Sequence, residues 1–168
     1  KMQERTLDLL IIGGGITGAG VALQAAASGL ETGLIEMQDF AEGTSSRSTK
    51  LVHGGLRYLK QFDVEVVSDT VSERAVVQQI APHIPKPDPM LLPVYEEEGA
   101  TFSLFRLKVA MDLYDLLAGV NNTPAANKVL SKEEVLEREP ELKKEGLVGG
   151  GVYLDFRNND ARLVIENI

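Results

Sequence analysis

The 168-residue sequence contains no cysteine and no tryptophan, and only 5% of its residues are aromatic. The absence of cysteine excludes a disulfide scaffold, a thiolate zinc site and thiol catalysis. Basic residues are also scarce: 17 Lys and Arg stand against 25 Asp and Glu, which gives a formal net charge of −8. This acidic balance argues against binding to nucleic acid or to an anionic membrane surface, because both require clustered positive charge.

Long hydrophobic runs are missing as well. No stretch approaches the roughly 20 apolar residues that span a bilayer, and residues 1–8 lack the apolar core of a signal peptide. We therefore expect a cytoplasmic protein. Hydrophobic residues still make up 43% of the chain, which is ordinary for a globular domain with its own core.

The first forty residues carry the pattern of a βαβ unit. The apolar run 6–12 ends at three glycines, which is typical of a buried parallel strand. Small and apolar residues over 16–27 predict a tightly packed helix that ends at Ser28 and Gly29. Residues 30–36 return as a second strand, so the two strands should be parallel and adjacent.

Periodicity and punctuation predict the remaining elements. Five prolines between Pro82 and Pro93 indicate an extended, semi-rigid segment. The spacing of Ser131 and Glu134 is that of a capping box, which opens a short helix closed by Pro140. In chain order we expect an irregular loop over 39–49, a helix over 64–80, a strand over 90–95, a solvated tip at Glu96–Glu98, a helix over 102–118, a loop over 121–127, a strand over 152–156 after Gly149–Gly151, and a helix from Asp160 that is unfinished at Ile168.

Residues 13–18 read Gly-Gly-Gly-Ile-Thr-Gly and match the dinucleotide-binding pattern G-x-G-x-x-G between a strand and a helix. Gly13 would form the tight turn, Gly15 would let a pyrophosphate approach the backbone, and Gly18 would let the helix lie close to the strands. Glu36 ends the second strand, where an acid binds a ribose hydroxyl and disfavours a 2′-phosphate. The alternative is a glycine-rich turn made for packing alone, which leaves Glu36 unexplained.

Residues 43–59 distinguish FAD from NAD, because an NAD domain of the usual kind would continue into its next helix. Instead the segment contains hydroxyls, three bases and a glycine pair, reading Gly-Thr-Ser-Ser-Arg-Ser-Thr-Lys-Leu-Val-His-Gly-Gly-Leu-Arg-Tyr-Leu. Hydroxyl and backbone donors suit a pyrophosphate or a flavin ring, and glycines allow close approach to a flat ligand. The segment therefore favours FAD.

With these motifs the sequence resembles the FAD-dependent glycerol-3-phosphate dehydrogenases and oxidases. The resemblance runs along essentially the whole chain and is most specific at 12–20, 45–59, 81–83 and 153–163. It implies an α/β fold: a Rossmann-like FAD-binding domain of the glutathione-reductase and D-amino-acid-oxidase type, with a doubly wound sheet that is incomplete in this chain. Residues 1–80 would be its N-terminal part, and 81–168 a Pro-rich strand and helical segment leading into the substrate or cap region.

The resemblance also implies the roles of individual residues. The fingerprint and Glu36 would hold the ADP half of FAD, and Arg57 and Tyr58 would lie on the substrate side of the flavin. An arginine suits a phosphate dianion or a developing alkoxide. The implied cofactor-binding residues are Gly13, Gly14, Gly15, Ile16, Thr17, Gly18, Glu36, Ser45, Ser46, Ser48, Thr49, Lys50, Leu51, His53, Gly54 and Gly55.

Members of this family oxidise sn-glycerol 3-phosphate to dihydroxyacetone phosphate, with oxygen or a quinone as the final acceptor. We favour oxygen, which gives hydrogen peroxide, because no basic amphipathic surface for membrane docking is visible. The resemblance implies no metal, and a homodimer stays open. The general base and other phosphate ligands would belong to parts of the family's sequence that this chain lacks.

Simpler interpretations remain beside these. Arg57 could pair with an acid on a sheet edge, Tyr58 could be a core residue, His53 and His83 could be structural, and Arg47 and Lys50 could be solvated loop charges. Asp160 with Arg162 could cap and orient the last helix. For the whole chain, the alternatives are a quinone-linked dehydrogenase, another FAD-dependent amine or hydroxy-acid oxidase, and a non-catalytic dinucleotide-binding module.

Overall fold

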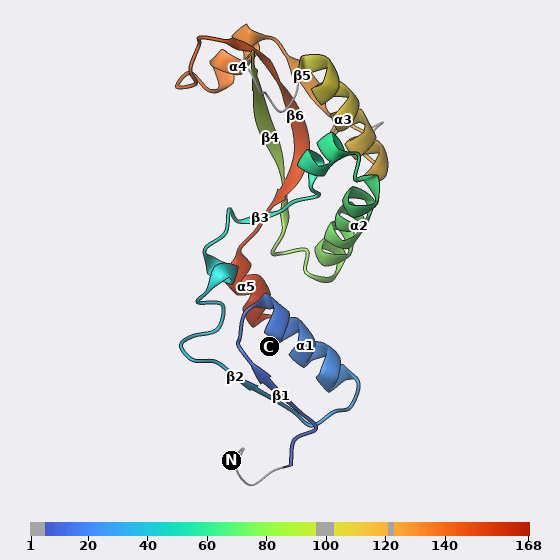
Figure 1. Ribbon diagram of the computed structural model, residues 1–168, viewed down its shortest axis with the longest axis vertical. Coiled ribbons are helices and arrows are strands. Elements are labelled where there is room, and N and C mark those ends of the chain that lie inside the picture. Colours follow the sequence, from blue (N-terminus) through green and yellow to red (C-terminus); the bar gives the residue numbers. More distant parts are fainter. Residues whose placement is uncertain (1–5, 97–102, 121–122) are drawn as a thin grey trace. The chain divides into compact units, whose positions relative to one another are not determined.

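The structure, a computed structural model, describes residues 6–96, 103–120 and 123–168 (Figure 1). It divides into two compact units, of which the first is Lys1–Leu51 with Asn158–Ile168 and the second is Val52–Arg157. The expected division at residue 80, between part of the FAD-binding domain and a segment leading into the substrate or cap region, stays a prediction. The features expected at Glu97, Glu98, Phe102 and 121–122 lie outside the described residues.

The first unit contains the predicted βαβ unit. Strand β1 (Leu9–Ile12) is followed by helix α1 (Ile16–Ala27), whose bounds agree with the prediction, and by strand β2 (Thr32–Ile35). The two strands are parallel neighbours, with Leu9 opposite Thr32. The expectation of adjacent parallel strands is confirmed, and the pair forms the beginning of a Rossmann-like sheet.

Two further helical segments complete the first unit. The 3₁₀ turn η2 (Thr44–Ser46) lies in the predicted irregular loop, and helix α5 covers Asp160–Ile165. The side chain of Asn159 caps α5 by accepting a hydrogen bond from the Arg162 N–H, so the assignment of the cap to Asp160 is wrong. The helix ends at Ile165, which makes the expected helix to Ile168 too long. Ala19, Ala41 and Val164 form the buried centre of this unit.

The second unit is built on a mainly antiparallel sheet that sequence analysis predicted only in part. Its strands are β4 (Lys86–Tyr95), β5 (Lys128–Leu130) and β6 (Leu147–Arg157), and β3 (Leu51–Val52) joins β6 at the boundary between the units. The order is β3-β6-β4, and β5 also pairs with β6. The described part of the chain thus holds one parallel pair and a second, mainly antiparallel sheet. Strands β3 and β5 were not predicted.

Strand β6 begins earlier than expected, because Gly149, Gly150 and Gly151 lie inside it and not in a preceding turn. A Cβ at Gly151 would lie 2.6 Å from the Met111 sulfur, and one at Gly150 would lie 3.0 Å from Val135 Cγ2. These glycines therefore let helices approach the strand from both faces. Strand β4 likewise starts four residues before the predicted one, since prolines are tolerated at the edge of a sheet.

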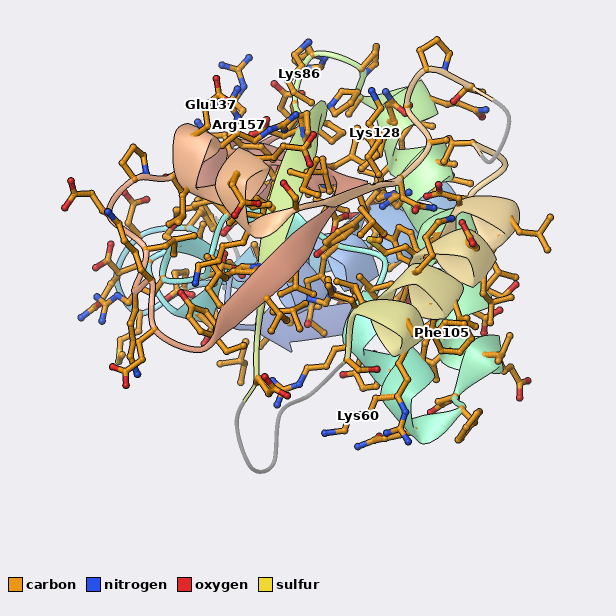
Figure 2. The ribbon with its side chains drawn as sticks, turned by 90° about the horizontal axis from the view of Figure 1, so that it is seen from above. Lys60, Lys86, Phe105, Lys128, Glu137 and Arg157 are labelled. Carbon is orange, nitrogen blue, oxygen red and sulfur yellow. The ribbon has the colours of Figure 1, made fainter. Side chains whose placement is uncertain are left out.

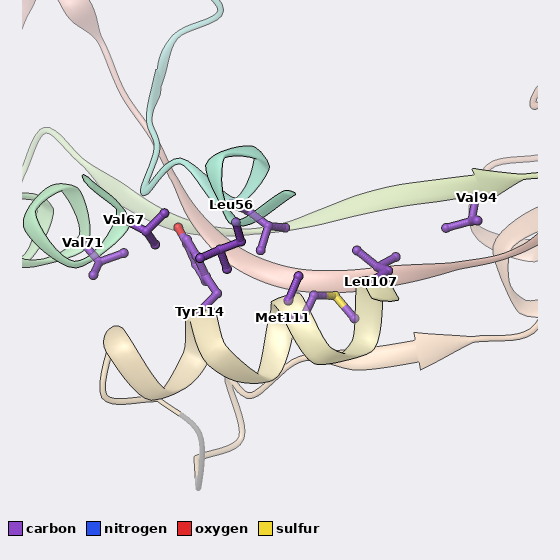
Figure 3. Packing of buried hydrophobic residues seen from close by; sticks show 9 residues of the cluster. Leu56, Val67, Val71, Val94, Leu107, Met111 and Tyr114 are labelled. Carbon is purple, nitrogen blue, oxygen red and sulfur yellow. The ribbon is translucent and has the colours of Figure 1, made fainter. Parts of the chain in front are cut away.

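Helices cover the sheet of the second unit. The 3₁₀ helix η3 (Leu56–Gln61), α2 (Val64–Ile80) and α3 (Leu104–Leu117) surround one apolar core, and α4 (Lys132–Arg138) packs around a smaller one with Leu130 and Leu147. Figure 3 shows the main core, which brings together Leu56, Val67, Val71, Val94, Leu107, Met111 and Tyr114. On the opposite face of α3, Phe105 is 78% exposed and points away from the core (Figure 2).

Two local predictions are confirmed in this unit. Helix α2 has the predicted bounds, and Ser131 and Glu134 form a capping box at the start of α4. In the described part of the chain, no helix is long and apolar enough to cross a membrane.

Candidate functional site

The glycine-rich turn between β1 and α1 has the geometry that its sequence predicts. Gly13 has a φ of +111°, in a region that favours glycine, and so forms the tight turn out of β1. A Cβ at Gly18 would lie 1.9 Å from the Gly13 carbonyl oxygen and 3.5 Å from Ile11 Cγ2. Glycine at 18 is therefore required for α1 to start this close to the turn and to β1.

Gly15 differs from these two glycines, because the protein itself leaves room for a side chain there. Its φ of −80° is ordinary, and the nearest atom to an added Cβ would be the Ser45 hydroxyl at 3.3 Å. The N–H groups in the first turn of a helix have no partner inside that helix. In α1 this turn contains no acidic residue, and the N-cap residue Gly15 has no side chain to cap it, so the end of the helix suits an anionic ligand.

Ser45 is brought to the same place. Its hydroxyl accepts a hydrogen bond of 3.0 Å from the N–H of Ile16, the first residue of α1. The structure thus joins a residue of the 43–59 segment to the fingerprint. Thr17 is exposed in the same turn of the helix.

Glu36 lies at the end of β2 and turns its carboxylate toward the fingerprint. Oε2 accepts a 2.6 Å hydrogen bond from the Gly14 N–H, and Oε1 accepts one of 3.0 Å from the Gln38 N–H. The bond from Gly14 is the main cause that lowers the pKa of this carboxyl below its ordinary value. Glu36 is therefore an ionised acceptor beside the turn, able to receive hydrogen bonds from hydroxyl groups.

The following residues of the segment are tied to the start of α5. Ser48 and Asp160 share a hydrogen bond, and Lys50 Nζ lies 3.7 Å from Asp160 Oδ2. The Lys50 carbonyl also accepts a 2.7 Å hydrogen bond from the Asn158 N–H. Lys50 has a φ of +62°, a left-handed conformation that costs energy for a residue with a side chain. These contacts hold the loop and argue against a merely solvated Lys50.

Other members of the predicted set have simpler surroundings. Ser46 is half-buried and its carbonyl accepts a hydrogen bond from the Lys50 ammonium group. Thr49 is exposed, and Leu51 is half-buried in β3. Arg47 forms an exposed ion pair of 3.0 Å with Glu42, which agrees with its interpretation as a loop charge.

In the second unit, the His53–Gly55 segment is held by its neighbours in that unit. A Cβ at Gly54 would lie 2.3 Å from the Tyr114 hydroxyl and 2.4 Å from Val71 Cγ1, so this glycine is required by packing inside the protein. Gly55 is left-handed, with a φ of +73°, and starts η3. Its N–H donates to His53 Nδ1 at 3.2 Å, which orients the exposed imidazole ring.

Arg57 and Tyr58 follow on η3. Both are exposed, Tyr58 to 45%. Among residues 6–96, 103–120 and 123–168, Arg57 has neither a hydrogen bond nor an ion pair. The alternative in which Arg57 pairs with an acid on a sheet edge thus finds no support in this part of the chain, and its guanidinium group can bind an external anion.

The core below this segment contains a buried polar network that was not predicted from the sequence. Arg74, Tyr114 and Asp155 are exposed to 4%, 0% and 2% of their surface, and Arg74 forms a buried ion pair of 2.9 Å with Asp155. Arg74 lies seven residues after the buried Val67, within the apolar stripe of α2. The signal in the sequence was a positive charge, Arg74, among the apolar residues of α2 and a negative charge, Asp155, among those of β6.

Comparisons with known proteins show the family to which the chain belongs. The model of the FAD dependent oxidoreductase family matches residues 8–168. The chain is 95% identical over its whole length to an alpha-glycerophosphate oxidase of Streptococcus pneumoniae, and 78% identical to one of Enterococcus casseliflavus. It spans 28% of the length of both relatives.

A solved structure is also similar. The crystal structure of glycerol-3-phosphate dehydrogenase from Bacillus halodurans complexed with FAD aligns with 99% of this chain, with a TM-score of 0.67 and 42% sequence identity. The alignment covers 24% of that protein. The similarity thus extends over nearly the whole of this chain.

Proposed function

This chain belongs to the FAD-dependent oxidoreductase family, and we propose that it forms the ADP-binding part and a substrate-side segment of an enzyme that oxidises sn-glycerol 3-phosphate. The observation that carries the proposal is the 95% identity, over all of this chain, to a protein named alpha-glycerophosphate oxidase. The chain covers 28% of that relative, so the activity is proposed for the full-length protein.

The residues of the first unit fit the ADP half of FAD. The first turn of α1 offers N–H groups to a pyrophosphate, and Gly15 leaves space at the backbone. The ionised Glu36 would accept hydrogen bonds from the ribose hydroxyls, and it would repel a 2′-phosphate. Ser45 would present its hydroxyl beside the pyrophosphate, because it already bonds to the N–H of Ile16.

The remaining predicted residues would hold the rest of the cofactor. Ser46, Ser48, Thr49, Lys50 and Leu51 would wrap the pyrophosphate and the flavin ring through hydroxyl and backbone groups. The bonds of Ser48 and Lys50 to Asp160 support this role, since they fix the path of the loop. From the second unit, His53, Gly54 and Gly55 would contact the flavin ring.

Arg57 and Tyr58 would bind and orient the substrate. The Arg57 guanidinium group, which has no acidic partner among the residues that the structure describes, can donate two parallel hydrogen bonds to a phosphate dianion. The Tyr58 hydroxyl can donate to a substrate oxygen. Holding the phosphate at a fixed point would orient the C2–H bond of glycerol 3-phosphate for oxidation.

The proposed reaction removes a hydride, that is, a proton with two electrons, from C2 and a second proton from the C2 hydroxyl group, which leaves the carbonyl of dihydroxyacetone phosphate. A bound FAD would supply the two-electron acceptor, with oxygen as the final acceptor that is reduced to hydrogen peroxide. The base that takes the hydroxyl proton would come from a part of the protein outside this chain.

A quinone-linked dehydrogenase is the second candidate, because the solved relative at 42% identity is named a glycerol-3-phosphate dehydrogenase. The relatives at 78% and 95% identity are named oxidases, and this favours oxygen as the acceptor. Another FAD-dependent oxidase would share the cofactor site but not the substrate.

An absorbance experiment on the purified full-length protein separates these candidates. We expect flavin bands that bleach when glycerol 3-phosphate is added without oxygen and that return, with one equivalent of hydrogen peroxide, when air is admitted. Bands that stay bleached in air until a quinone is added would favour the dehydrogenase. Bands that glycerol 3-phosphate does not bleach would refute the substrate, and protein that cannot bind FAD would refute the cofactor.

A further inference from the structure

A buried polar network lies beneath the segment that carries His53, Arg57 and Tyr58. It consists of Arg74 on α2, Tyr114 on α3 and Asp155 on β6. Arg74 Nη1 donates to Tyr114 Oη at 2.6 Å and to Asp155 Oδ1 at 2.9 Å. Since a buried charge is costly unless it is paired and hydrogen-bonded, these contacts explain how the core tolerates Arg74 and Asp155.

Aromatic rings enclose the guanidinium group of Arg74. Its Cζ atom lies 4.5 Å from the centre of the Phe156 ring and 5.5 Å from that of Tyr114. A guanidinium group between two rings and a carboxylate has little freedom to move. The network is therefore a rigid anchor for the hydroxyl group of Tyr114.

That hydroxyl group holds the backbone of Gly54. The Gly54 N–H donates to Tyr114 Oη at 3.1 Å, and the Gly54 carbonyl accepts from Thr70 Oγ1 at 2.9 Å. Side chains from α3 and α2 thus bind both polar atoms of one residue in the segment. Figure 3 shows the Tyr114 ring extending from α3 to the side of the core where Val67 and Val71 lie.

The direction of the hydrogen bonds in this network is fixed. Arginine and the Gly54 N–H can only donate, so Tyr114 Oη accepts from both and its own proton points to Asp155 Oδ1 at 3.5 Å. Burial raises the pKa of Tyr114 above its ordinary value, which keeps this proton in place. Burial also raises the pKa of the Asp155 carboxyl, and the Arg74 guanidinium group opposes that rise.

We propose that Arg74, Tyr114 and Asp155 are positioning residues that hold the His53–Tyr58 segment in the conformation needed for the flavin and the substrate. The proposal rests on the proposed function. From Gly54 the constraint extends in both directions, because the Gly55 N–H donates to His53 Nδ1 and the Gly55 carbonyl accepts from the Tyr58 N–H at 2.8 Å. Arg57 lies within that first turn of η3.

A purely structural role would predict something different. A network that only fills the core would lower the stability of the second unit when disrupted, without a specific change at residues 53–58. Tyr153 provides a matched control, because its ring packs edge-on against that of Tyr114 at 5.7 Å. Its side chain is partly buried against the same core, but no hydrogen bond joins its hydroxyl to the described part of the segment.

The test compares Tyr114→Phe with Tyr153→Phe in the full-length, FAD-loaded protein. In Tyr114→Phe we expect amide hydrogen exchange at residues 53–58 to become roughly 10-fold faster, because one hydrogen bond to the segment is lost. We also expect the KM for glycerol 3-phosphate to rise about 10-fold, since Arg57 is no longer held in place. Tyr153→Phe should change neither quantity.

A second variant tests the same segment if Tyr114→Phe does not fold. Thr70→Val removes the other side-chain bond to Gly54 with little change in shape, and Thr70→Ser should restore it. The expected result is faster exchange at 53–58 in Thr70→Val and recovery in Thr70→Ser. Equal exchange in all these variants, or equal changes in Tyr114→Phe and Tyr153→Phe, would overturn the proposal.

Failure of the proposed function would look different. In that case glycerol 3-phosphate would leave the wild-type flavin unbleached, while hydrogen exchange at 53–58 and the Kd for FAD could still be measured. A weaker Kd and faster exchange in Tyr114→Phe alone would then support the positioning role without the substrate. A wild-type protein that turns over glycerol 3-phosphate, together with variants that behave alike, would overturn only the positioning role.

Discussion

Replacing Gly18 by alanine tests the geometry of the fingerprint turn most directly. An alanine Cβ at this position would lie 1.9 Å from the Gly13 carbonyl oxygen and 3.1 Å from the Gly13 carbonyl carbon. Both atoms belong to the backbone, so no side-chain rotation relieves the overlap. The start of α1 or the turn must therefore move by more than 1 Å, roughly the shortfall from ordinary van der Waals contact.

The cost of this shift can be estimated. Overpacking a well-packed site typically costs about 1–3 kcal/mol, and a backbone overlap belongs at the upper end, about 3 kcal/mol. For a domain of roughly 150–250 residues, each kcal/mol lowers the melting temperature by about 2–4 °C. We therefore expect Gly18→Ala to lower the temperature of flavin release by roughly 6–12 °C.

Gly20 on the same helix is the control, because nothing lies within 4 Å of a Cβ added there. Alanine is favoured over glycine inside a helix by about 0.5–1 kcal/mol, so Gly20→Ala should melt slightly higher than the wild type. The assay is thermal release of FAD from the full-length protein, followed by flavin fluorescence. If Gly18→Ala and Gly20→Ala melted at the same temperature, the close contact between α1 and the turn would be refuted.

Three further predictions concern the cofactor, the substrate and stability in acid. Gly15→Ala should leave the melting temperature of the apoprotein nearly unchanged but weaken FAD binding, because only the Ser45 hydroxyl lies near the added Cβ. Calorimetry of the apoprotein and a flavin titration measure these two effects, and a destabilised apoprotein would contradict the distinction between Gly15 and Gly18. Arg57→Ala should keep its flavin but lose roughly 100-fold in kcat/KM for glycerol 3-phosphate, with a smaller loss in Arg57→Lys; unchanged kinetics would return Arg57 to a structural role. Because its hydrogen bonds lower the pKa of Glu36 in the folded state, the stability that this carboxylate contributes should be present above the ordinary pKa of glutamate and lost as the pH falls through the lowered value. Glu36→Gln should therefore show a flatter decline of stability in acid than the wild type, and parallel curves would count against the ionised carboxylate.

Helix ends, caps and tight turns could be predicted from the sequence, because each depends on only a few neighbouring residues. The bounds of α1 and α2 agree with the predicted ones because a glycine or proline marks an end and the apolar spacing fills the interior. The left-handed Gly13 and the capping box at Ser131 were also predictable, since each needs only a few neighbouring residues.

The sheet of the second unit could not be read in this way. Glycines usually mark a turn, but those of β6 lie in the strand because Met111 and Val135 approach it from opposite faces. β5 has three residues and finds its partner in β6, nearly twenty residues further along the chain. Such elements depend on contacts between distant residues, which no short window of sequence contains.

The candidate site shows the same limit. The chemistry of Glu36 and Ser45 was predicted, but the partners that hold the 45–58 segment were not, because Tyr114 and Asp160 lie far from it in the sequence. Helical spacing alone places Tyr114 with Leu107 and Met111 on the apolar face of α3, but its hydroxyl accepts a hydrogen bond from the Gly54 N–H. A buried tyrosine usually places its hydroxyl on a specific partner, and this principle was the available indication.

These partners change how variants of the 45–58 segment should be interpreted. Ser45 bonds to the start of α1, Ser48 and Lys50 to Asp160, and Gly54 to two helices, so each has a structural partner within the protein before any ligand binds. Loss of FAD on substitution of such a residue does not establish a contact with FAD. Only a residue whose replacement leaves the apoprotein stable and still weakens FAD binding qualifies as a ligand. By this criterion Gly15 and the exposed Thr49 are informative positions, whereas Gly54 is not, because alanine there collides with Tyr114 and Val71 whether or not FAD is bound.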